Sequence, residues 1–214
     1  MGQAWFAKRN GSKHRRRCID GKKLICQFRV VLVGESSVGK TSLVLRLTEG
    51  TFAEGVQMTS GVDFYIHTLR MPAGQRVKLQ VWDLAGRLDH RSFTISSLYT
   101  MLGVLLIFDI TKRHSLDYIG NWLDETREVF NQCKCTFILV GHKSDLSTER
   151  NISREEAEHV AEGLGMRYIE TSAKDDTNIK EVFHMLASSI AGLVKSEIED
   201  SLIASAFSFS TNDV

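Results

Sequence analysis

The sequence predicts an α/β protein whose helices cover both faces of a mostly parallel sheet. Short apolar runs at residues 28–34, 103–110 and 136–141 have the length of buried strands. Continuous apolar runs of this kind are typical of parallel strands that are covered on both faces. Between them, apolar residues recur at three- and four-residue spacing, as in amphipathic helices. This alternation of strands and helices favours a layered α/β arrangement.

The composition is that of an ordinary globular chain. Its 214 residues are 43% hydrophobic and 25% charged, and they include a single proline, Pro72. A chain of this length favours one domain with tails and can bury a sizeable core. A mostly disordered protein, a collagen-like repeat and a small disulfide scaffold are therefore excluded. No run approaches the ~20 apolar residues of a membrane-spanning helix.

Charge divides the chain unevenly. Residues 1–23 carry eight basic residues and one acidic residue, a net charge of +7, whereas the rest of the chain carries −6. We expect residues 1–26 to form a disordered basic arm, 27–195 a globular domain and 196–214 a flexible tail. Attraction of the arm to anionic lipid stays open as an alternative. Nucleic-acid binding is disfavoured, because the arm has few interleaved aromatic residues.

The first half of the domain is predicted to form a strand, a helix and a hairpin. The strand at 28–34 stops at a glycine, and a helical stretch follows at 42–47. Residues 62–70 and 75–83 alternate between apolar and polar side chains. Such alternation predicts an antiparallel hairpin, which would turn at 71–74.

The second half is predicted to alternate strands with helices. Apolar residues within 119–130 and 179–194 recur at helical spacing and predict two helices. Ser153 and Glu156 match a capping box, which predicts that a third helix begins there. A further strand is expected at 166–170.

The loop after the first strand has a phosphate-binding pattern. It matches G-x-x-x-x-G-K-[ST] at Gly34-Glu35-Ser36-Ser37-Val38-Gly39-Lys40-Thr41. The glycines let backbone N–H groups point at phosphate oxygens, and the following helix N-terminus adds partial positive charge. Lys40 is expected at the β- and γ-phosphates and the Thr41 hydroxyl at Mg²⁺. The loop therefore predicts a nucleoside triphosphate site.

A second element follows at the end of the predicted hairpin. Asp83 would end a strand beside the phosphate-binding loop, where a carboxylate suits the Mg²⁺ shell through a water. Gly86 has no side chain to block the approach of its backbone N–H to the γ-phosphate. The order of the two elements strengthens the prediction of a nucleotide site.

Two later segments indicate the base. Asp145 follows the apolar run 136–141, and its carboxylate can accept from both the ring N–H and the exocyclic amine of guanine. The aliphatic stem of Lys143 can cover the base plane. The backbone N–H of Ala173, after the strand at 166–170, could meet the guanine carbonyl. Adenine cannot supply this pairing, so guanine is the better reading.

On these motifs the chain resembles the Rab family of Ras-like small GTPases over residues 27–195. Thr59-Ser60-Gly61-Val62-Asp63-Phe64 is similar to the first switch segment of Rab proteins, and Phe52 matches an aromatic residue that packs on the guanine. The resemblance implies the P-loop small-GTPase fold. That fold has a mostly parallel six-stranded sheet with one antiparallel edge hairpin and helices on both faces.

The resemblance also implies a switch that binds GTP or GDP with Mg²⁺ and recruits effectors in vesicle-mediated membrane traffic. Partners would be effectors, an exchange factor and a GTPase-activating protein, and the chain would be a monomer. Bound GTP would order switch I (about residues 50–64) and switch II (about residues 84–98). The metal residues implied are Thr41, Thr59 and Asp83. The nucleotide-binding residues implied are Gly34, Glu35, Ser36, Ser37, Val38, Gly39, Lys40, Thr41, Ser42, Phe52, Thr59, Gly86, His142, Lys143, Asp145, Leu146, Ser172, Ala173 and Lys174.

The sequence departs from the family at the catalytic position. Arg87, next to Gly86, replaces the glutamine that orients the attacking water. Arginine is permanently charged and has no acceptor, so it cannot take a hydrogen bond from that water. We expect slow hydrolysis. A GTP-loaded binding module that does not cycle stays open as the alternative.

Other departures concern the base motif and switch II. His142 replaces the usual asparagine, although imidazole can still make one hydrogen bond. Ser97 stands where an aromatic residue would join Phe64 and Trp82 in an effector-facing cluster. Further unusual switch II residues are Leu84, Leu88, Asp89 and His90.

The last departure concerns the membrane. The last cysteine is Cys135, so the prenylation cysteines of Rab proteins are missing from the sequence. We expect a largely soluble, cytoplasmic protein with at most weak contact to anionic lipid through the basic arm.

Overall fold

A computed structural model describes residues 18–20, 23–72, 74–86, 100–132 and 135–210. Its sheet has seven strands, of which six lie in the order β3-β4-β2-β5-β6-β7, and β1 pairs with β2. The strands are β1 (Cys18–Asp20), β2 (Lys23–Val33), β3 (Val62–Arg70), β4 (Arg76–Leu84), β5 (Gly103–Asp109), β6 (Thr136–His142) and β7 (Arg167–Thr171). The β3–β4 hairpin is antiparallel, and β4, β2, β5, β6 and β7 run parallel. The predicted parallel sheet with an antiparallel edge hairpin is confirmed.

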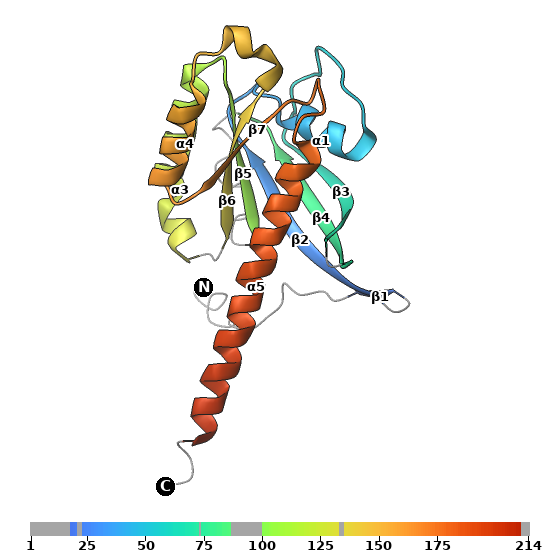
Figure 1. Ribbon diagram of the computed structural model, residues 1–214, viewed down its shortest axis with the longest axis vertical. Coiled ribbons are helices and arrows are strands. Elements are labelled where there is room, and N and C mark those ends of the chain that lie inside the picture. Colours follow the sequence, from blue (N-terminus) through green and yellow to red (C-terminus); the bar gives the residue numbers. More distant parts are fainter. Residues whose placement is uncertain (1–17, 21–22, 73, 87–99, 133–134, 211–214) are drawn as a thin grey trace, which may run out of the picture.

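Helices cover both faces of this sheet (Figure 1). They are α1 (Lys40–Glu49), α3 (Arg113–Gln132), the 3₁₀ helix η2 (Ser144–Glu149), α4 (Arg154–Gly163) and α5 (Ile179–Ser210). On one face, α1 and α5 pack around Leu43 and Phe183. On the other, α3 and α4 pack around Ile119 and Ala157. The central strand β5 is buried along its whole length, as expected of a strand covered on both faces.

The predicted capping box is present at the start of α4. The Ser153 Oγ accepts a hydrogen bond from the Glu156 backbone N–H at 3.1 Å. This bond satisfies one of the N–H groups that a helix leaves unpaired at its N-terminus. The sequence pattern therefore located the first residue of α4 correctly.

The expected limits of the arm and the tail differ from the structure at both ends. Residues 18–20 and 23–26 lie in strands, because β1 pairs with β2 and β2 continues along β4 as far as the Ile25–Arg76 pair. The helical pattern does not end near Lys195, because α5 continues to Ser210. Residues 196–210 contain no glycine or proline, so nothing in their covalent structure stops the helix. Residues 1–17 and 211–214 lie outside the described residues.

Among the described residues, no helix has both the length and the apolar character needed to cross a bilayer.

Candidate functional site

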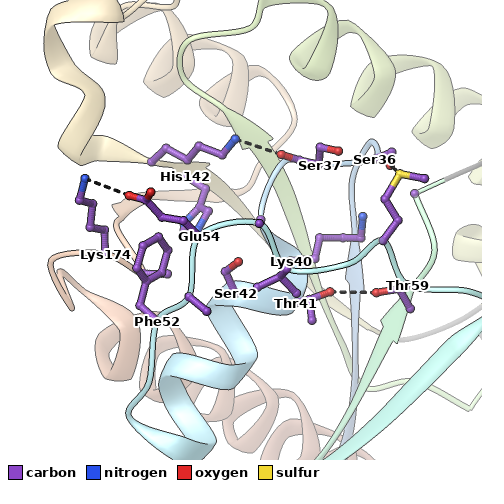
Figure 2. Close-up of a pocket in the computed structure, with 18 of the residues that line it drawn as sticks. Ser36, Ser37, Lys40, Thr41, Ser42, Phe52, Glu54, Thr59, His142 and Lys174 are labelled. Atoms are coloured by element: carbon purple, nitrogen blue, oxygen red, sulfur yellow. Dashed lines mark hydrogen bonds and ion pairs between the residues drawn. The ribbon is translucent and has the colours of Figure 1, made fainter.

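The site lies at the edge of the sheet where the parallel strands β2, β5 and β6 end. A cavity of about 470 Å³ opens there. Its lining comes from the loop after β2, from the segment between α1 and β3, and from the loops after β4, β6 and β7. Figure 2 shows side chains from these segments facing one another across the cavity. A position at the carboxyl ends of parallel strands is where α/β proteins commonly bind ligands.

The loop after β2 surrounds the Lys40 side chain and accepts hydrogen bonds from it through backbone oxygens. The Lys40 Nζ donates to the backbone oxygens of Gly34 at 3.0 Å and Glu35 at 2.9 Å. Burial lowers the pKa of Lys40 to about 8, while the charges of Asp83 and Glu35 oppose that shift. A desolvated ammonium held in a loop of backbone groups is suited to binding phosphate oxygens.

Glycine is required at both ends of this loop. A Cβ on Gly34 would lie 2.1 Å from the Ile107 backbone oxygen, so any side chain there would collide with β5. Gly39 has a φ of 101°, and its Cβ would lie 2.5 Å from the His142 ring. The same restriction applies at Gly86, where a Cβ would lie 2.2 Å from the Ser36 backbone nitrogen. The backbone of the loop is thus closely packed against β5, β6 and the end of β4.

Three side chains that can bind a metal ion through oxygen lie beside Lys40: Thr41, Thr59 and Asp83. The Thr41 Oγ1 donates to Asp83 Oδ2 at 2.5 Å and lies 2.9 Å from the Thr59 Oγ1. Asp83 is fully buried, and its Oδ1 has no hydrogen-bond partner among the described residues. Burial raises the pKa of Asp83, while the Thr41 hydrogen bond and the Lys40 charge oppose that shift.

This donor set fits Mg²⁺. Mg²⁺ is commonly held by one or two carboxylates together with substrate phosphates rather than by a protein cage. The part of the chain that the structure describes contains no group of three or more His, Cys, Asp or Glu side chains that could hold a metal ion. The buried, unpartnered Asp83 Oδ1 is the atom that a divalent cation or its bound water would satisfy.

At the other end of the cavity, β6 and β7 bring two segments together. The Ser172 Oγ donates to the Asp145 Oδ1 at 2.6 Å. Lys143 has a φ of 64°, and its Nζ lies 2.6 Å from the Asp109 Oδ2 and 3.0 Å from the Ser37 oxygen. The Lys143 stem is therefore fixed between β5 and the phosphate-binding loop. Asp109 is 1% exposed, and Lys143 and Thr111 hold the pKa of its carboxyl below its ordinary value despite the opposing effect of burial.

His142 is a buried connection between three segments. Its ring is 2% exposed, its Nδ1 lies 2.8 Å from the Thr171 Oγ1, and its other edge packs against Gly39. Burial and the charge of Lys143 lower the pKa of His142 to about 4, so the imidazole is neutral near pH 7. One ring thus joins the ends of β6 and β7 to the phosphate-binding loop.

Comparison with known proteins identifies the family. The model of the Ras family matches residues 29–192. Mouse Rab-39A is 44% identical over 175 residues, which cover 80% of this chain and 81% of the mouse protein. Mouse Rab-42 is 44% identical over 167 residues, which cover 77% of each chain. Rab-39 of Caenorhabditis elegans is 42% identical over 171 residues, 78% of this chain and 75% of the nematode protein.

This chain belongs to the Rab family of Ras-like small GTPases. The predicted family and its GTPase fold are therefore confirmed.

The segment predicted as switch I contributes residues 52–59 to the lining of the cavity. The Lys174 Nζ lies 3.7 Å from the Glu54 Oε1, and the Ser36 Oγ donates to the Met58 Sδ at 3.4 Å. Phe52, which is 36% exposed, and Thr59 both line the cavity, Phe52 near Lys174 and Thr59 beside Thr41 (Figure 2). These contacts join residues 52–59 of the segment to the other residues that line the cavity.

Most of the predicted nucleotide-binding residues line the cavity. They are Ser36, Ser37, Gly39, Lys40, Thr41, Ser42, Phe52, Thr59, Gly86, His142, Lys143, Asp145, Leu146, Ala173 and Lys174. The other four predicted residues are not among those that line it. Gly34 meets Lys40 through its carbonyl, Val38 is a core residue, and Ser172 meets Asp145. Glu35 turns its carboxylate to the Nε2 of His114, 3.1 Å away.

Phe64 and Trp82, which are predicted to face effectors, lie on the sheet face opposite α1 and α5. Phe64 and Trp82 are cross-strand neighbours, with ring centroids 5.1 Å apart and ring planes at 64°. Phe64 is 45% exposed. Arg87, Leu88, Asp89, His90 and Ser97 lie outside the described residues.

Two residues that contact the site, Asp109 and Arg46, were not predicted from the sequence. Asp109 ends β5, so a carboxylate at the end of a predicted parallel strand was an available signal. Arg46 lies in the last turn of α1 and reaches the loop after β7, which is distant in the sequence. No pattern in the sequence indicates that contact.

Proposed function

We propose that this Rab protein is a Mg²⁺-dependent GTP/GDP switch that recruits effectors in vesicle-mediated membrane traffic and hydrolyses GTP slowly. Nucleotide and Mg²⁺ binding are supported by one observation: Thr41, Thr59 and Asp83 lie together beside the loop that surrounds Lys40. Thr59 belongs to switch I, so the same cluster joins the switch to the metal site. Uptake of labelled GTP or GDP by folded protein in magnesium buffer tests this proposal, and failure to bind either nucleotide refutes it.

The phosphates and the metal have separate binding groups in this proposal. Lys40 and the backbone N–H groups of residues 34–41 hold the β- and γ-phosphates. Thr41 and Thr59 provide hydroxyl oxygens to Mg²⁺, and Asp83 provides a carboxylate directly or through a water. Mg²⁺, when bound, neutralises negative charge that develops on the phosphate oxygens. Removing the metal with a chelator should weaken nucleotide binding.

Guanine is selected at the other end of the cavity. The Asp145 carboxylate accepts from the ring N–H and the 2-amino group, and the Ala173 N–H donates to the guanine carbonyl. The Ser172 hydroxyl at 2.6 Å supports this role, because it fixes one Asp145 oxygen. The Lys143 stem, anchored at Asp109 and Ser37, covers the base. Competition by GDP, and not by ADP, is the expected binding result.

Slow hydrolysis rests on Arg87, beside the closely packed Gly86. Because a guanidinium has no acceptor, it cannot take the hydrogen bond from the attacking water that a glutamine would accept. We expect Arg87→Gln to raise the single-turnover rate of GTP hydrolysis. Equal rates in the two proteins would show that Arg87 is not the limiting residue.

A second candidate function is a GTP-loaded binding module that has lost the enzymatic cycle, and Arg87 also favours it. The nucleotide in purified protein separates the two candidates. Bound GTP that persists through purification favours the module. Accumulated GDP favours the enzyme.

Effectors are proposed to bind over Phe64 and Trp82. The exposed Phe64 ring and the neighbouring Ile66, which is 49% exposed, support an apolar docking surface on β3. The Phe64→Ala substitution should weaken binding of an effector in the GTP state.

An exchange factor and an activating protein are proposed as further partners of a monomeric chain. Residues 1–23, with their charge of +7, are proposed to make weak, salt-sensitive contact with anionic lipid.

A further inference from the structure

Arg46 connects α1 to the loop that follows β7. Its Nε donates to the Ala173 backbone oxygen at 2.6 Å, and its Nη2 donates to the Lys174 backbone oxygen at 2.9 Å. Its Nη1 donates to the Gly50 oxygen at 2.8 Å, at the start of switch I. One half-buried guanidinium thus holds backbone carbonyls from two segments. A planar fork with five donors can span such a set, whereas a lysine ammonium is a single point charge.

The contact with Lys174 continues to the base-recognising carboxylate. In a trans peptide group the C=O and N–H point in opposite directions. The Lys174 oxygen faces Arg46, and the N–H of the same peptide group, which belongs to Asp175, donates to the Ser172 Oγ at 3.1 Å. The Ser172 Oγ in turn donates to the Asp145 Oδ1 at 2.6 Å. An unbroken series of hydrogen bonds therefore runs from Arg46 to Asp145.

We propose that Arg46 is a positioning residue for guanine recognition, acting through the Lys174–Asp175 peptide group and the Ser172 hydroxyl to orient the Asp145 carboxylate. This inference rests on the proposed guanine-nucleotide function. Among the described residues, the hydrogen bonds of Arg46 go to backbone oxygens and not to the nucleotide-binding side chains. Its loss leaves the Asp145 carboxylate in place, but frees the peptide group that fixes its hydrogen-bond partner.

The 2-amino group of guanine provides a direct readout of Asp145. IDP differs from GDP only in lacking this group. The Kd for IDP divided by the Kd for GDP therefore reports the hydrogen bond from the amine to the carboxylate. A hydrogen bond to a charged group corresponds to a preference of about tenfold or more for GDP. We expect Arg46→Met to lower that ratio about threefold or more, and Ser172→Ala to lower it in the same direction. Arg46→Lys should retain part of the preference.

The test is competition of GDP and IDP against fluorescent GDP, in magnesium buffer, on the full chain. Arg154→Met is the matched control, because Arg154 is exposed on α4 and its one hydrogen bond and ion pair among the described residues is with Glu158 at 2.8 Å. Its ratio should equal that of the unmodified protein. A purely structural role for Arg46 would lower the unfolding temperature and weaken GDP and IDP equally, leaving the ratio unchanged.

The outcomes are distinguishable. If the unmodified protein binds no GDP, the proposed function fails. If it prefers GDP over IDP, and Arg46→Met and Ser172→Ala keep the full preference, the inference about Arg46 is wrong. Should Arg46→Met not fold, Arg46→Lys and Ser172→Ala decide, since a full GDP preference in both overturns the inference.

Discussion

Lowering the pH should destabilise the folded protein through His142. Burial and the Lys143 charge lower the pKa of His142 to about 4 in the folded protein, against 6.5 for an unperturbed histidine. Asp145 and Asp109 raise the pKa and only partly oppose this shift. Between the two pKa values, the unfolded chain takes up a proton that the folded protein does not. The contribution of His142 to stability is therefore complete above about pH 6.5 and is lost as the pH falls toward 4.

The magnitude follows from the two pKa values. One pKa unit corresponds to about 1.4 kcal/mol, so the full difference is about 3 kcal/mol at low pH. At about pH 5 the unfolded histidine is almost fully protonated and the folded one mostly neutral. The expected loss there is about 2 kcal/mol relative to about pH 7. This is a large fraction of the stability of a typical domain.

Urea unfolding across this pH range measures the effect, at fixed GDP and magnesium concentrations so that ligand binding does not change the comparison. His142→Asn is the control, because the amide keeps hydrogen-bonding capacity and does not titrate. Subtracting its unfolding free energy removes the contributions of other titrating groups. The unfolding free energy of the unmodified protein minus that of His142→Asn should fall by about 2 kcal/mol between about pH 7 and pH 5. Parallel curves for the two proteins would refute the assignment of a buried, neutral histidine.

Three further predictions concern Gly39, the Ser153 cap of α4 and the Asp109 anchor of Lys143. Gly39→Ala should lower the free energy of unfolding by about 1–3 kcal/mol, because residue 39 has a φ of 101°. Gly120→Ala, at an exposed and sterically open position in α3, should raise it by about 0.5–1 kcal/mol. Thermal unfolding of the two variants measures both effects. Ser153→Ala should lower the free energy of unfolding in urea by about 1 kcal/mol, because the helix loses its N-cap hydrogen bond. Ser153→Asp should retain most of the stability. An unchanged urea midpoint in Ser153→Ala would contradict the role of Ser153 as a cap. Asp109→Asn should speed GDP release on the order of tenfold by removing the ionic anchor of Lys143, and unchanged release would exclude that role.

Motifs with a local cause could be predicted from the sequence. The loop of residues 34–41 combines glycines, a lysine and a threonine at fixed spacing, and that spacing can be read directly along the chain. The same holds for the Ser153 cap and for the hairpin of β3 and β4. The limits of β2 and α5 were less predictable, because strand pairing and the absence of a stop signal, rather than local pattern, decide where these elements end.

The sequence by itself determined the order of strands and helices, the phosphate-binding loop and the family. These depend on residue type and spacing along the chain. Only the tertiary structure decided that Arg46 reaches the loop after β7, that Asp109 anchors Lys143, and that His142 is buried against Gly39. Each contact joins segments that are distant in the chain, so its existence depends on how the strands order themselves in the sheet. The protonation of His142 follows from that packing, because burial, not residue type, lowers its pKa.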